Sequence, residues 1–148
     1  MNHSKKTKAG FTFIELLLVI GLVIALGVPA ASFSARFMRQ MAVRDASEGL
    51  IMMLQEARAY TSYGKNGSGW GVKLEADRLI LFAGGSFAER NPSLDISFSF
   101  NQNVGIEGFS EIIFRYPDCR PDQGSSQIGL FWGDAQESFV LNQEGIIE

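Results

Sequence analysis

The chain has 148 residues, of which 46% are hydrophobic and 20% are charged, and its formal net charge is −3 at pH 7. This length allows one modest domain plus one additional element. With His3 as the only histidine and Cys119 as the only cysteine, a His/Cys metal cluster and an intramolecular disulfide are excluded. Because no basic residue follows Arg120, the carboxy-terminal part is acidic, which disfavours nucleic acid as a ligand.

The amino terminus combines a basic start with a long apolar segment. Three lysines among residues 1–10 precede an apolar run from Phe11 to Phe33, in which Glu15 is the only acid. The run is close to the ~20 residues that a helix needs to cross a bilayer. A charge at the centre of such a helix costs roughly 2.5–3.5 kcal/mol, so Glu15 predicts a functional role rather than simple anchoring.

Two ordinary interpretations of this segment leave residues unexplained. A cleaved secretory signal would use the small residues at 28–30, but its apolar core is normally 7–15 residues long and contains no acid. A plain membrane anchor accounts for the length of the segment and leaves Glu15 without a purpose.

A third interpretation uses every residue of the segment. The run Lys5-Lys6-Thr7-Lys8-Ala9-Gly10-Phe11-Thr12-Phe13-Ile14-Glu15-Leu16-Leu17 resembles the prepilin-type leader of type IV pilins and type II secretion pseudopilins. The resemblance implies cleavage after Gly10 by prepilin peptidase, N-methylation of Phe11, and an assembly role for Glu15 as partner of a neighbouring subunit's amino terminus. It also implies a single pass through the inner (cytoplasmic) membrane, with the head outside the cytoplasm, and later transfer into a pilus or pseudopilus filament.

Elementary physical chemistry agrees with this interpretation. The lysines favour a cytoplasmic leader by the positive-inside rule, although Arg36, Arg39 and Arg44 on the far side weaken that bias. Cleavage would create an amine at Phe11, four residues from Glu15, and residues i and i+4 share one face of a helix. In low-dielectric surroundings a paired charge is tolerable, whereas an unpaired one is costly.

Beyond residue 33 the pattern predicts that the helix continues to about residue 62. Apolar residues recur at spacings of three and four, which predicts one face that packs on a sheet. Pro29 is expected to bend or locally open this helix. Gly64, Gly67 and Gly69 are expected to end it. The predicted apolar face comprises Phe33, Phe37, Met41, Leu50, Met53, Leu54 and Ala57.

From Trp70 onward the pattern is that of short strands. Residues 71–75 and 78–82 predict a hairpin, and residues 94–100 alternate apolar and polar, which predicts a half-buried strand. Further strands are predicted at 112–116, 128–132, 138–141 and 146–147. This part looks like the H-type minor pseudopilins, a looser resemblance carried by Gly71-Val72 to Phe82, Ser97-Phe98-Ser99-Phe100 and Phe139-Val140-Leu141-Asn142 through Gly145-Ile146.

The sequence therefore predicts an α+β fold, with a long N-terminal helix packed on an antiparallel sheet or a two-sheet β head. The first half of the helix is predicted to be transmembrane and the second half amphipathic. The expected segments are a leader at 1–10, a transmembrane or filament-core helix at 11–33, an amphipathic helix at 34–63 and a β head at 64–148.

No catalytic constellation is evident, so we expect the chain not to be an enzyme and to need no cofactor. Three loop acids lack the spacing of a calcium site and are interpreted as solvated. Cys119 is interpreted as a buried small residue, with an intermolecular disulfide as the alternative. A basic patch made by Lys65, Lys73, Arg78 and Arg90 is conceivable. The loop acids are Asp118, Asp122 and Asp134; Trp70, Phe131 and Trp132 are interpreted as core or sheet-packing residues.

The leading hypothesis is a structural subunit, of the minor type, in a type IV pilus-like or type II secretion filament. Its expected partners are prepilin peptidase, other pilin or pseudopilin subunits, and the inner membrane. The alternative is a membrane-anchored or secreted β-domain binding module that acts as a monomer.

Overall fold

The computed structural model describes residues 11–148, without the side chains of residues 27–32. The chain divides after Ala35 into two compact units. Helix α1, Phe13–Ser62, contributes residues to both units, and its bounds confirm the predicted helix.

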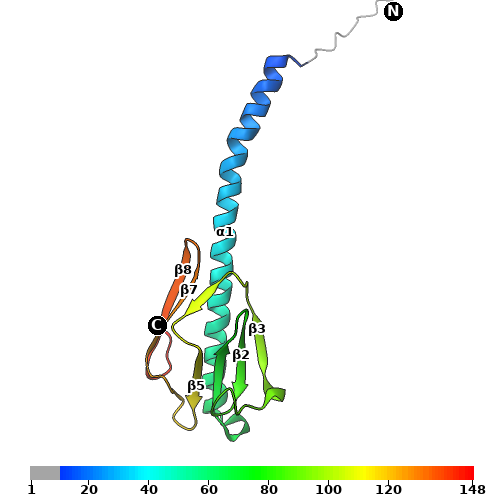
Figure 1. The fold of residues 1–148 in the computed structure, drawn as a ribbon. Helices are drawn as coiled ribbons and strands as arrows, with labels where there is room; N and C mark the ends of the chain where they lie inside the picture. Colours follow the sequence, from blue (N-terminus) through cyan, green and yellow to red (C-terminus); the bar gives the residue numbers. More distant parts are fainter. Residues whose placement is uncertain (1–10) are drawn as a thin grey trace, which may run out of the picture. The chain divides into compact units, whose positions relative to one another are not determined.

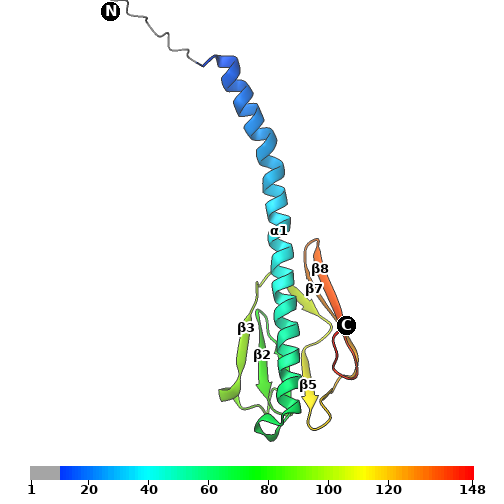
Figure 2. The same cartoon turned by 180° about the vertical axis from the view of Figure 1, so that it is seen from behind.

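Residues 36–148 form an α+β unit in which the second part of α1 packs on two antiparallel sheets. The five-stranded sheet has the order β3-β2-β1-β5-β6, and the three-stranded sheet has the order β4-β7-β8. Figures 1 and 2 show this part of α1 lying along both sheets, with the carboxy terminus beside β7 and β8. The strands are β1 (Trp70–Leu74), β2 (Arg78–Ala83), β3 (Ile96–Ser99), β4 (Gly105–Glu107), β5 (Glu111–Arg115), β6 (Arg120–Pro121), β7 (Ser126–Trp132) and β8 (Ala135–Leu141), and the 3-10 helices are η1 (Lys65–Gly67) and η2 (Pro92–Leu94).

The predicted hairpin at 71–82 is confirmed as β1 and β2. Its register runs from the pair Trp70↔Ala83 to the pair Leu74↔Leu79. Strand β1 also pairs with β5, which places it at the centre of the larger sheet. Trp70 is 1% exposed, and its interpretation as a core residue is confirmed.

The predicted strand at 94–100 is shorter than expected, because Leu94 belongs to η2 and only 96–99 are extended. Its alternation is also incomplete, since Ile96 is 44% exposed. Phe98 docks this strand on the helix, because its ring lies where a Cβ at Gly49 of α1 would be. The helix therefore needs glycine at position 49 to receive this ring.

Two short strands, β4 and β6, were not predicted from the sequence. Strand β6 contains Pro121, and proline is unusual inside a strand because it has no N–H group to donate. The proline fits because β6 is at the edge of its sheet, where a residue without an N–H group leaves no ladder bond unmade. In β7, Phe131 is 46% exposed and packs across the sheet on Gly105, so it is a sheet-packing residue, as one of the two predicted roles had it, and not a core residue.

The buried face of α1 begins later than the sequence predicts. Leu50, Met53, Leu54 and Ala57 are buried as expected, together with Val43 and Ala46. The predicted inclusion of Phe33, Phe37 and Met41 is wrong, because these side chains are 74%, 50% and 44% exposed. One turn before Val43 the same face carries arginine: Arg39 and Arg36 pair with Asp134, at the turn between β7 and β8, with N–O distances of 2.8 and 3.7 Å.

The end of α1 is fixed to the sheet by a buried hydroxyl. Thr61 Oγ1 donates to Ala57 O at 2.9 Å and accepts from Trp70 N at 2.9 Å. Gly64 then leaves the helix with φ 61°, a conformation that favours glycine, as predicted for the helix end. The first residue of β1 is thereby tied directly to the last turn of α1.

Candidate functional site

Thr12 caps the start of helix α1, a role that was not assigned to it from the sequence. The N–H of Glu15 donates to Thr12 O at 3.1 Å and to Thr12 Oγ1 at 3.3 Å. A threonine followed by glutamate three residues later is a recognised helix-start signature, so the signal was present at 12–15. The carboxylate of Glu15 lies in the first turn, where the positive end of the helix dipole favours it.

The apolar side chains that follow Thr12 are exposed. Phe11, Phe13 and Ile14 are 82%, 77% and 71% exposed, and the large apolar residues from Leu16 to Leu26 lie between 46% and 67%. A contiguous apolar surface of this extent marks a site of contact with a protein or a membrane. Within the part of the chain that the structure describes, no helix is long and apolar enough to cross a membrane.

The structure describes the other predicted residues of this segment to different extents. Gly10 lies outside the described residues. Phe11 precedes α1, so the helical i,i+4 relation to Glu15 is absent from the uncut chain. The helix continues through Pro29, whose side chain is not described, and the bend expected there stays a prediction.

Two of the three loop acids have different partners in the structure. Asp122 Oδ1 accepts from Ile113 N at 3.1 Å, and Asp134 pairs with Arg39 and Arg36. Residues 11–148 contain no group of three His, Cys, Asp or Glu side chains able to hold a metal ion.

The four residues of the conceivable basic patch are engaged individually. Lys73 lies 3.7 Å from Glu111, and Arg78 Nε lies 2.8 Å from Glu75. Lys65 Nζ lies 3.3 Å from the centroid of the Tyr60 ring. These contacts partly neutralise the charges on which a patch would depend.

Arg90 organises the loop between β2 and β3. Its Nε donates to Asp95 Oδ2 at 2.8 Å, its Nη1 donates to Phe87 O at 2.8 Å, and its guanidinium lies 3.6 Å from the Phe87 ring centroid. The other oxygen of Asp95 is buried without a hydrogen bond. Arg90 therefore supplies the charge that makes a half-buried Asp95 tolerable.

Substitution Arg90→Gln is expected to lower the free energy of unfolding by about 1–3 kcal/mol, because Asp95 would keep its burial and lose its cation. Chemical unfolding followed by tryptophan fluorescence measures this change. Arg78→Gln is the matched control, since the Arg78–Glu75 pair is more exposed and is expected to contribute less than about 1 kcal/mol. Equal losses in the two variants would contradict the assigned role of Arg90.

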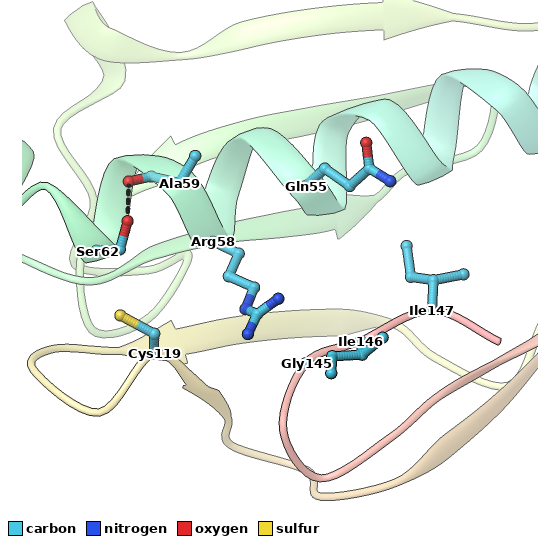
Figure 3. Close-up of a pocket in the computed structure, with 8 residues that line it drawn as sticks. All are labelled: Gln55, Arg58, Ala59, Ser62, Cys119, Gly145, Ile146 and Ile147. Atoms are coloured by element: carbon cyan, nitrogen blue, oxygen red, sulfur yellow. Dashed lines mark hydrogen bonds between the residues drawn. The ribbon is translucent and has the colours of Figure 1, made fainter.

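Cys119 is half-buried rather than buried, so its interpretation as a core residue is wrong. It occupies the left-handed region with φ 55° in the turn between β5 and β6. Its Sγ lies 3.4 Å from Pro117 O. With Arg58, Cys119 lines a cleft that has no counterpart in the sequence-based predictions (Figure 3).

Compared with models of protein families, with curated proteins and with solved structures, the chain matches none. What the structure establishes is an α+β fold, in which a long N-terminal helix packs on antiparallel sheets.

Proposed function

We propose that this chain is a structural subunit, of the minor type, of a type IV pilus-like or type II secretion pseudopilus filament. Prepilin peptidase would cleave it after Gly10, and Phe11 would be N-methylated. The N-terminal helix would pass from the inner membrane into the filament core, while the β head would face outward. The chain would be a substrate of processing enzymes and not itself an enzyme.

One observation carries the proposal: an exposed apolar helix that starts directly after Gly10-Phe11 and bears a single carboxylate in its first turn. Glu15 forms no ion pair within residues 11–148. Large apolar side chains are unfavourable in contact with water. An unpaired carboxylate is unfavourable once it is transferred into apolar surroundings. A neighbouring subunit that supplies an apolar helix and a free amine satisfies both requirements.

The α+β architecture is consistent with this proposal. The exposed first part of α1 would make the contacts of assembly, and the second part of the same helix packs on the sheets of the head. Residues 36–148 have their own buried core, which supports a head that stays folded while the exposed segment changes its surroundings. The same compact unit also suits the alternative, a monomeric binding module, so the two functions must be separated by experiment.

Mass spectrometry of the mature amino terminus tests the proposal directly. The expected product begins at Phe11 and carries one added methyl group on its amine. A chain that begins near residue 31 would identify an ordinary signal peptide, and an uncut chain in a cell with active prepilin peptidase would contradict the processing step. Gly10→Val is expected to block cleavage, because the added side chain obstructs close approach to the peptide bond.

A further inference from the structure

A cleft on the unit 36–148 is formed by segments that are far apart in the sequence. Its walls are the last turns of α1, the turn that contains Cys119, and residues 145–147, and its volume is about 430 Å³. Ala59, Ile146 and Ile147 supply apolar wall, and Arg58 supplies the only positive charge. Figure 3 shows the Arg58 side chain crossing the cleft from the helix, between Cys119 and Gly145.

The stem of Arg58 lies beside Gly145 in the wall of the cleft. Gly145 has φ 75°, and a Cβ at this residue would lie 2.8 Å from the Phe114 ring and 3.4 Å from both Cδ and Nε of Arg58. The positive φ and the nearness of the Phe114 ring favour glycine at residue 145, whereas a Cβ there would meet the arginine stem only at an ordinary van der Waals distance. The end of the guanidinium is left inside the cleft.

Arg58 differs from the other half-buried basic residues in having no acidic partner. Among residues 11–148 there are four half-buried basic side chains, and three of them pair with carboxylates: Arg39 with Asp134, Lys73 with Glu111, and Arg90 with Asp95. No carboxylate in this range lies within 4 Å of Arg58. A partly desolvated cation without a counter-charge is unfavourable unless a ligand supplies the negative charge.

We propose that this cleft binds the carboxylate of an aspartate or glutamate side chain presented by a partner protein. The planar guanidinium donates two parallel hydrogen bonds to a carboxylate, which is its best-matched anion in geometry. The cleft contains one positive charge, which matches a carboxylate better than a phosphate dianion. Ala59, Ile146 and Ile147 accept the aliphatic residues that flank the acid. The proposal does not depend on the filament assignment.

Cys119 provides a reporter, because it lines the cleft and is the only cysteine of the chain. The full chain, purified in a mild detergent, is treated with an uncharged maleimide, and the rate of Cys119 alkylation is measured with increasing concentrations of three probes. The probes are an acetylated and amidated Leu-Glu-Leu peptide, its Leu-Gln-Leu counterpart, and inorganic phosphate. We expect the acidic peptide to slow alkylation at concentrations where the neutral peptide and phosphate have no effect.

Arg58→Gln is expected to weaken the apparent affinity for the acidic peptide by about tenfold or more, the loss typical of a hydrogen-bonded charge pair. Arg115→Gln removes the same charge from an exposed arginine outside the cleft and is expected to leave the affinity unchanged. Because Arg58 has no acidic partner among residues 11–148, its variant is also expected to unfold at the same temperature as the parent chain.

Several results would overturn the proposal. Among them are equal protection of Cys119 by the neutral peptide, stronger protection by phosphate, and full retention of the peptide's effect in Arg58→Gln. The proposal would also be overturned if the acidic peptide did not slow alkylation of Cys119. That measurement is made on the parent chain and needs no variant.

Discussion

Glu15→Ala is expected to reduce incorporation of the chain into filaments by at least about tenfold while cleavage after Gly10 continues. The expected size follows from one buried ion pair, since losing a partner in a low-dielectric site costs roughly 3–5 kcal/mol. In the proposed function the peptidase acts before assembly, so processing would not depend on the pair. The measurement is the amount of the chain in sheared filaments relative to the amount in membranes, with mass spectrometry of both pools.

The matched control is Glu48→Ala, another exposed glutamate on α1. Its carboxylate already accepts from Arg44 Nε at 2.7 Å within the same helix, which raises the pKa of Arg44 and leaves Glu48 engaged inside its own chain. Glu48→Ala is therefore expected to assemble normally. Normal incorporation of Glu15→Ala would refute the assembly role and favour a monomeric module.

Under the proposed function, the start of helix α1 would be formed before cleavage. In the uncut chain Phe11 lies before the first helical residue, and Glu15 is held by a helix start that Thr12 caps. The backbone of Glu15 is thus already helical before any amine exists at Phe11. In the proposed function, cutting the bond after Gly10 would supply that amine beside a helix start that is already formed.

The sequence predicted most of the fold, because the relevant signals are local. An alternating segment at 71–75 followed after a short connection by an apolar run at 79–82 was enough to place β1 and β2, and glycines marked the end of α1. Strand β4 was missed because its three residues are too few to show a period. Strand β6 was missed because Pro121 is compatible with a strand only at a sheet edge, which is a property of the assembled sheet.

The candidate sites divide in the same way. Glu15 was found because a lone acid in an apolar run is visible in the sequence itself. Arg58 could not be found, since its lack of a partner depends on where every carboxylate lies after folding. Cys119 was misjudged for a related reason: whether a single cysteine is buried is decided by the turn between β5 and β6, not by its neighbours in the chain.

Leu50→Ala is expected to lower the free energy of unfolding by about 2–5 kcal/mol, the range typical of a leucine removed from a core. Leu50 is 0% exposed and belongs to the cluster that joins α1 to both sheets. Urea unfolding of the full chain, followed by the fluorescence of Trp70 and Trp132, measures the change. A loss below about 1 kcal/mol would mean that α1 is not packed on the sheets as described.

Phe37→Ala is the matched substitution on the opposite face of the same helix. Phe37 is 50% exposed, so its removal is expected to change the stability of the head by no more than about 0.5 kcal/mol. The two variants separate folding from assembly. If exposed apolar residues of α1 contact neighbouring subunits, Phe37→Ala is expected to lower the filament fraction without lowering stability. Leu50→Ala is expected to lower the filament fraction only because less of the chain is folded. Normal assembly of Phe37→Ala would place the contact surface of α1 before residue 37, within the apolar segment that begins at Phe11.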